Sequence, residues 1–202
     1  MKKLENLTKE NLCHIAREIA DVYMSEPGLF PMVFSKEKCR LYFDALVQII
    51  YENDSLYTIN DEQDGYCAYW AKADKPPIHK YFKLAYLLIK KLSLKDLVAL
   101  IKALKGHRGY EKIYKNQEYV DFFMVVVKKE KQGQGLLRVA LNEAFAYADA
   151  LGVPCVLDTD SKLKADKYIH CGMRLIYHQQ LASHAEMFTL AYSGVEQYTD
   201  IK

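Results

Sequence analysis

The chain has 202 residues and a net charge of +2, with 50% hydrophobic and 27% charged residues. This composition excludes a disordered chain and allows one domain with a sizeable core. No apolar run approaches the roughly 20 residues that span a membrane, and the N-terminus, M-K-K-L-E-N-L, lacks the apolar segment of a signal peptide. We therefore expect a cytoplasmic protein with no membrane partner. Five cysteines without Cys-x-x-Cys spacing, and six histidines without ligand spacing, predict neither a disulfide framework nor a metal site.

The charges are unevenly distributed along the chain. Residues 76–138 contain 14 basic and 5 acidic residues, whereas the segments on either side are acidic. A polyanion such as nucleic acid is one partner for this basic belt. The belt has no recognisable nucleic-acid-binding module, however, and its lysines alternate with an apolar stripe. Nucleic acid is therefore an unlikely partner, and we expect the lysines to form a solvated helix face.

The first part of the chain predicts two helices. Thr8 and Asn11 have the spacing of a helix N-terminus, and the helix that follows ends near Pro27. Ser35 is a plausible N-cap for a second helix, in which apolar residues recur at helical spacing as far as Ile50.

The period then changes twice. Alternating residues predict strands over 56–60 and 66–73, joined by a polar hairpin. Helical spacing returns from His79 to about Lys105, with a break near Ser93 and an end at Gly106.

The segment from Val125 to Leu137, V-V-V-K-K-E-K-Q-G-Q-G-L-L, predicts a buried strand, a glycine loop and the start of a helix. Glycines allow successive backbone N–H groups to converge, and the first N–H groups of a helix are unpaired at the positive end of its dipole. This arrangement predicts an anion site. The helix reaches about Leu151 and ends at Gly152.

Residues 153–157 form the next apolar run, which we expect to lie parallel to the first strand after a right-handed crossover. The last two predicted strands, 174–180 and 186–192, form a hairpin.

Two nucleotide-binding patterns fit this unit poorly. A Walker loop needs Lys and Ser or Thr at the helix start, where Leu136 and Leu137 stand. A dinucleotide fold needs a third glycine, where Arg138 stands. Asp158 lies near the place of the ribose-binding acid, but too few residues follow it to complete a doubly wound sheet.

A third pattern resembles the GNAT N-acetyltransferase superfamily. Gln132, Gly133, Gln134, Gly135 and Leu136 match its acetyl-CoA motif, and Leu137 replaces the small residue that usually ends it. The segment L-D-T-D-S-K-L-K-A-D-K-Y-I-H-C-G-M, residues 157–173, looks like the second signature of the family. There Tyr168 and Gly172 stand at matching places, while Met173 replaces the usual Phe. The resemblance covers roughly residues 119–192.

The resemblance implies a single α+β domain over residues 1–202, with a mixed, mostly antiparallel sheet of six or seven strands flanked by helices. The helical segment 79–116 would then be an insertion before the central strand. It could be a lid over the acceptor site, a contact in a homodimer, or additional cover for the core.

The resemblance also implies a function, transfer of an acetyl group from acetyl-CoA to a primary amine of a small molecule or peptide, without a metal. The alternative is a non-catalytic module of the same fold that binds coenzyme A or another anion. Coenzyme A would pair with the backbone of the central strand, and its pyrophosphate with the loop N–H groups. The implied cofactor-binding residues are Val125, Val126, Val127, Gln132, Gly133, Gln134, Gly135, Leu136, Leu137, Arg138, Ser161 and Lys164.

The resemblance assigns Tyr168 as the general acid that protonates the departing thiolate. A general base is harder to choose, and Glu118, Asp121 and Asp158 are the candidates. Strand alternation would place Asp121 on the same face as Val125.

Overall fold

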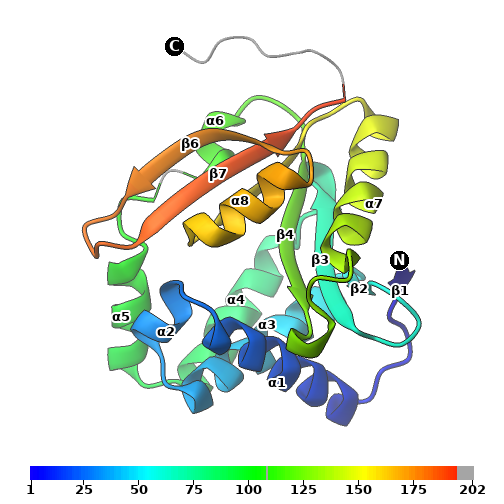
Figure 1. Ribbon diagram of the computed structural model, residues 1–202. Coiled ribbons are helices and arrows are strands. Elements are labelled where there is room, and N and C mark those ends of the chain that lie inside the picture. Colours follow the sequence, from blue (N-terminus) through cyan, green and yellow to red (C-terminus); the bar gives the residue numbers. More distant parts are fainter. Residues whose placement is uncertain (108, 195–202) are drawn as a thin grey trace.

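The computed structural model describes residues 1–107 and 109–194, which form a seven-stranded sheet with helices on both faces (Figure 1). The strand order is β1-β2-β3-β4-β5-β7-β6, and only β4 and β5 are parallel. The mixed, mostly antiparallel α+β fold that the sequence predicts is confirmed. The strands are β1 (Lys2–Lys3), β2 (Leu56–Thr58), β3 (Gly65–Ala71), β4 (Val120–Val127), β5 (Cys155–Thr159), β6 (Arg174–Gln180) and β7 (Glu186–Tyr192).

Helices α1 (Lys9–Ser25) and α3 (Lys36–Glu52) pack together on one face of the sheet. The Thr8 side chain accepts from the N–H of Asn11, and the Asn11 side chain accepts from the N–H of Thr8, so the two residues form a capping box. The apolar stripe of each helix faces β2, β3 and β4. Burial of these stripes is the main stabilising contribution of this layer.

Helix α7 (Leu136–Leu151) covers the opposite face, and α8 (Lys162–His170) lies beside it over β6 and β7 (Figure 1). Three small residues, Ala140, Ala144 and Ala148, are fully buried and bring α7 close to the sheet. Gly152 ends the helix in the left-handed region, with φ of 67°.

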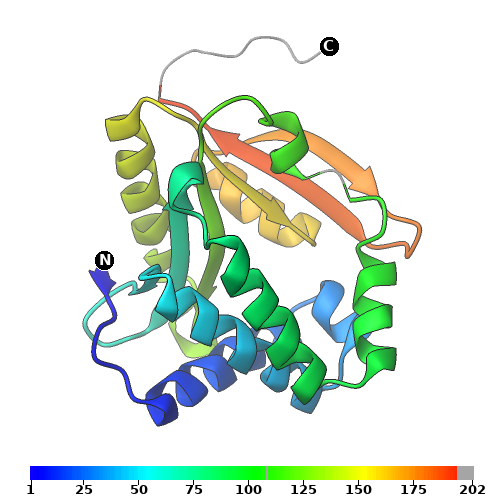
Figure 2. The same cartoon turned by 180° about the vertical axis from the view of Figure 1, so that it is seen from behind.

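The segment between β3 and β4 contains α4 (Ile78–Lys91), α5 (Leu94–Ala103) and the short α6 (Tyr110–Ile113). Helix α4 packs on the outer side of α3, as seen from behind (Figure 2). Helix α5 lies against α2 (Leu29–Val33), a short helix that the sequence pattern does not predict. Among the described residues, no helix is long and apolar enough to cross a membrane.

Candidate active site

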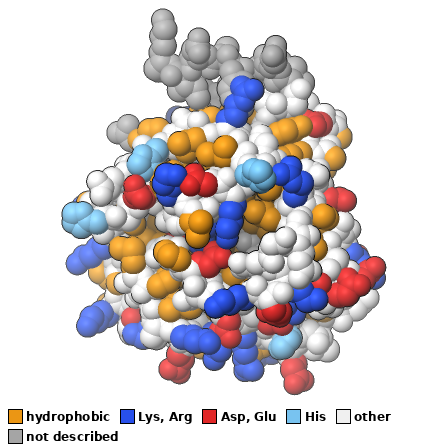
Figure 3. All heavy atoms as spheres, viewed as in Figure 1, with side chains coloured by type: hydrophobic (Ala, Val, Ile, Leu, Met, Phe, Trp, Pro, Cys, Tyr) orange, Lys and Arg blue, Asp and Glu red, His pale blue; other side chains and the backbone are white. Residues whose placement is uncertain are grey.

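A cavity of about 610 Å³ extends from the glycine loop into the interior. Its walls come from α1, α2, α3 and α5 on one side and from the loop, α7 and α8 on the other. Strands β4 and β5 form its floor, through residues 122–127 and 158–160. The face seen in Figure 1 carries apolar side chains among intermixed acidic and basic ones (Figure 3).

The floor is open because β4 and β5 diverge. They share only two registered pairs, Val120 with Cys155 and Asp121 with Val156. Beyond Asp121, β4 remains paired with β3 on its other edge. The β4 edge that faces the cavity therefore offers backbone N–H and C=O groups to a ligand.

A bulge in β4 corrects one detail of the sequence analysis. The register moves two residues along β3, from Ala68 to Trp70, while it moves three along β4, from Met124 to Asp121. One extra residue in β4 reverses the alternation beyond it. Val125 consequently packs with the α7 side of the sheet and does not share a face with Asp121, which packs under Tyr110 on the other side.

The glycine loop has the geometry of an anion site. Gly133 and Gly135 have φ of 80° and 82°, a conformation that other residues rarely adopt. A Cβ atom at either position would have no neighbour within 4 Å, so the loop surface is open. Gly135 is the N-cap of α7 and provides no side-chain cap, so the first N–H groups of a 16-residue helix point out of the loop.

The cavity lining includes most of the cofactor-binding residues that the sequence analysis names. These are Val125, Val126, Val127, Gln132, Gly133, Gly135, Leu136, Leu137, Arg138 and Lys164. Gln134 and Ser161 do not line it: Gln134 Nε2 lies 3.5 Å from the Glu130 carbonyl, and Ser161 caps α8 by accepting from the N–H of Lys164. Leu137 is half-buried and packs with the α7 cluster, so its bulk points into the helix layer.

Charged side chains surround the loop end of the cavity. Arg138 donates to the His170 carbonyl at 2.9 Å, and Lys167 lies 3.6 Å from Glu26. Lys164 pairs with Asp160 at 2.8 Å and lies over the Tyr23 ring. Asp160 also accepts from the N–H of Leu29 at 2.6 Å and so caps α2.

Tyr168 lines the cavity from α8, as the sequence analysis expects. Burial raises the pKa of Tyr168, and the negative charges of Asp160 and Glu26 add to this effect. Tyr23, whose pKa is also raised by burial, lies close enough to Tyr168 for the two to interact. Both phenols therefore stay protonated through the neutral range, as a proton donor must.

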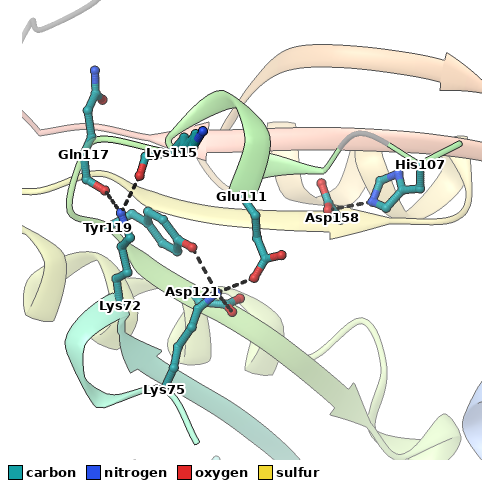
Figure 4. A network of polar contacts seen from close by, with 9 residues as sticks. All are labelled: Lys72, Lys75, His107, Glu111, Lys115, Gln117, Tyr119, Asp121 and Asp158. Carbon is teal, nitrogen blue, oxygen red and sulfur yellow. Dashed lines mark hydrogen bonds and ion pairs between the residues drawn. The ribbon is translucent and has the colours of Figure 1, made fainter. Parts of the chain in front are cut away.

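Two of the candidate bases lie away from the cavity. Glu118 is exposed in the segment before β4, and Asp121 is only 2% exposed and does not line the cavity. Asp121 belongs to a network under α6, in which Lys75 lies 3.8 Å from it and also contacts Glu111 and Tyr119 (Figure 4). Burial raises the pKa of Asp121 to about 7, although the Tyr110 hydroxyl donates to it.

Asp158, the third candidate, lies on the cavity floor and has two partners. The Thr189 hydroxyl donates to its Oδ1 at 2.6 Å, and His107 Nε2 lies 2.9 Å from its Oδ2 (Figure 4). The other ring nitrogen, His107 Nδ1, is buried without a hydrogen-bond partner among the described residues. A Cβ at Gly109 would collide with Asp158, so a glycine is needed where the chain crosses this pair.

The sequence analysis did not select His107, because a lone histidine in a loop carries no spacing signal. The sequence alone does not explain why a glycine stands at position 109. The fold explains it, because Asp158 lies where a Cβ atom of residue 109 would be.

The end of the cavity away from the loop is aromatic and aliphatic. Tyr23, Phe30, Tyr42 and Phe43 contact one another with ring centroids 4.8 to 5.3 Å apart. Leu46, Leu100, Leu104 and Met187 complete this apolar chamber. In the part of the chain that the structure describes, no group of three or more His, Cys, Asp or Glu residues could hold a metal ion.

Comparison with known proteins defines the class of fold. No protein-family model and no curated protein matches the sequence. A structure from Desulfovibrio desulfuricans, described as an acetyltransferase of the GNAT family, matches 93% of this chain and 94% of its own at 13% identity, with a TM-score of 0.51.

Two further structures match almost the full length. An arylalkylamine N-acetyltransferase from Aedes aegypti aligns over 95% of this chain and 97% of its own at 13% identity, with a TM-score of 0.57. A histone acetyltransferase-related acetyltransferase from Corynebacterium glutamicum aligns over 97% of both chains at 12% identity, with a TM-score of 0.56. The chain has the fold of the GNAT acetyltransferases. At such identities the likeness concerns the fold alone.

Proposed function

We propose that this chain transfers an acetyl group from acetyl-CoA to a primary amine of a small molecule that carries an apolar group. One observation supports this most strongly: a single cavity joins the open glycine loop to an apolar chamber, across the point where β4 and β5 diverge. A donor and an acceptor can therefore meet inside one enclosed space.

The loop end of the cavity fits coenzyme A. Its pyrophosphate would take the N–H groups of the loop and of the first turn of α7, where the helix dipole favours an anion. Arg138 and Lys167 add positive charge at this end. The pantetheine amides would pair with the open edge of β4, at Val125 and Val127.

The reaction needs one proton acceptor and one proton donor. Acetyl-CoA supplies a thioester that is already activated. The amine nitrogen attacks the carbonyl carbon, the new C–N bond forms and the C–S bond breaks. One proton leaves the nitrogen and another reaches the sulfur, so the products are an amide and a free thiol.

Asp158 is the cavity carboxylate best suited to accept the proton. Three carboxylates line the cavity, and Asp160 and Glu26 are each paired with a lysine. The partners of Asp158 are a hydroxyl and an imidazole, which need carry no charge. Asp158 therefore keeps its capacity to bind a substrate ammonium group and then take its proton.

His107 acts as a positioning residue for Asp158. Its ring lies against one carboxylate oxygen while Thr189 holds the other, and the carboxylate orientation is thus set from both sides. Tyr168, on the opposite wall, is the proposed donor to the departing sulfur. Glu118 and Asp121 remain testable alternatives as the base.

The apolar chamber supports an acceptor with an aromatic or branched aliphatic group. Its four aromatic rings and four aliphatic side chains would bury such a group, whereas a polyamine would leave its second charge without a partner there.

Two measurements test the proposal. Thermal unfolding with acetyl-CoA tests the donor site, since a ligand at 100 times its dissociation constant stabilises a protein by about 2.7 kcal/mol. Thiol release with a panel of amines tests the transfer, and we expect phenethylamine-like amines to exceed spermidine in kcat/KM. The absence of a thermal shift at millimolar acetyl-CoA would contradict the proposal. A shift without thiol release across the panel favours the non-catalytic coenzyme A-binding module.

A further inference from the structure

The outer face of the α4–α5 segment is apolar, although it faces solvent. In α4, Ile78, Phe82, Tyr86 and Ile89 are 55 to 70% exposed and recur at intervals of four, four and three residues. These intervals place them on one side of the helix, over a length of about 16 Å. In α5, Leu94, Val98 and Ile101 form a second stripe, with Leu94 78% exposed. We name these seven residues the α4–α5 patch.

The core does not account for this patch. The opposite side of α4 makes the contacts with the first core cluster, through Leu84 and Leu88, and no residue of α4 is buried. In α5, Leu97 and Leu100 face inward in the same way. Each helix is therefore apolar on two sides, and its outer side is exposed rather than packed against another described part of the chain. Eight of the large apolar residues that are exposed, the patch and Tyr81, lie in this single segment, which indicates an interaction surface.

The charges around the patch indicate what kind of partner it fits. Residues 78–105 contain seven lysines and one acid, Asp96, which is paired with Lys38 and caps α5. Lys90, Lys95, Lys102 and Lys105 make no ion pair among the described residues. Lys90 lies over the Tyr86 ring at 4.6 Å. The face drawn in Figure 3, which is the face of Figure 1, mixes acidic with basic side chains.

We propose that the α4–α5 patch binds the surface of an anionic lipid bilayer. A helix with aromatic and aliphatic residues on one side and lysines beside them is suited to lie in the interface plane, without spanning the membrane. Each lysine near an anionic leaflet adds to the attraction. A second copy of this chain fits less well. A two-fold contact would bring together the lysines of each copy that lack an ion pair among the described residues, Lys90, Lys95, Lys102 and Lys105.

This proposal does not depend on the proposed function. The sequence predicts no membrane partner because no segment is long and apolar enough to cross a bilayer. A helix that lies on the surface of a bilayer does not need such a segment. The sequence analysis also expected the lysines of this belt to form a solvated face. Lys83, Lys90, Lys95 and Lys102 are indeed exposed, and the apolar residues of the patch are exposed beside them.

Sedimentation with vesicles tests the proposal, using phosphatidylcholine alone and phosphatidylcholine with phosphatidylglycerol. We expect binding to the anionic vesicles that weakens as salt is added. Phe82→Ser and Ile89→Ser should each weaken it by about tenfold or more, because burial of one large apolar side chain contributes at least that factor. Lys95→Gln with Lys102→Gln should weaken it and reduce its salt dependence.

The control is Leu151→Ser, which alters another exposed leucine, 48% exposed, at the end of α7 and outside the patch. It should bind vesicles like the original protein. Circular dichroism confirms that each variant is folded. Failure to bind anionic vesicles would overturn the proposal. Binding by Phe82→Ser equal to that of the original protein would also overturn it. A dimer in sedimentation velocity that Phe82→Ser dissociates would assign the patch to a second copy and also overturn it.

Discussion

The buried carboxyl group of Asp121 should make the stability of this protein fall as the pH rises. Asp121 is 2% exposed, and burial raises its pKa from 3.8 to about 7. The unfolded chain therefore loses this proton near pH 4, while the folded chain keeps it until about pH 7. Below pH 4 the group is protonated in both the folded and the unfolded chain, so its titration does not change the stability there. Across the interval of roughly 3 pH units, at 1.36 kcal/mol per unit, the free energy of unfolding should fall by about 4 kcal/mol.

Asp121→Asn isolates this effect. The amide adds a constant cost of about 1 to 3 kcal/mol, because its NH2 group lacks an acceptor where Asp121 Oδ1 already has no partner. That cost does not change with pH, so the variant should be less stable than the original at pH 4 and more stable at pH 8. Urea unfolding of both proteins over this range measures the difference, in which other titrating groups cancel. A difference that is independent of pH would refute the reasoning. If Asp121 is instead the catalytic base, the same variant loses its activity.

Other substitutions test the cavity. Tyr168→Phe removes only the hydroxyl, and kcat should fall by about 10 to 100 times with acetyl-CoA affinity unchanged. An unchanged kcat, under conditions where chemistry limits the rate, would show that Tyr168 serves only in packing. Asp158→Asn should lower kcat/KM by about 100 times or more, whereas His107→Gln should have a smaller effect. Normal turnover by Asp158→Asn would exclude it as the base. Gly135→Val should abolish acetyl-CoA binding, measured by calorimetry, and leave the protein folded. The φ of 82° favours glycine, and the new side chain would occupy the open loop surface proposed for the pyrophosphate without meeting another protein atom. Asp160→Ala should destabilise the fold by about 2 to 3 kcal/mol in urea unfolding, because the Leu29 N–H and Lys164 both lose their acceptor.

The donor end of the cavity could be predicted because its signals are local. The strand, the two glycines and the amphipathic α7 follow one another between Val120 and Leu151, and each has its own pattern. Tyr168 follows from the same stretch of sequence. Even there the bulge in β4 was missed, because V-D-F-F-M-V-V-V contains no Gly or Pro to mark it.

The acceptor end could not be predicted, because it depends on contacts between distant residues. Helix α2 begins where the carboxylate of Asp160, 131 residues away, accepts the Leu29 N–H. His107 approaches Asp158 across 51 residues.

The two-residue strand β1 is too short to show an alternating pattern, and it forms only by pairing with β2. None of these contacts leaves a periodic signal in the sequence.

The helical segment between β3 and β4 connects the chamber to the outer surface. The inner side of α5 supplies Leu100 and Leu104 to the cavity, its outer side supplies Leu94, Val98 and Ile101 to the α4–α5 patch, and the loop that follows supplies His107 to Asp158. The loop end of the cavity, in contrast, is formed by β4, the glycine loop, α7 and α8, with Glu26 and Asp160 beside them. A segment that served only as cover would need one apolar side for each helix. Because α4 and α5 have two, the second side supports the proposal that the patch binds a membrane surface. A membrane bound there would lie one helix away from the proposed acceptor chamber.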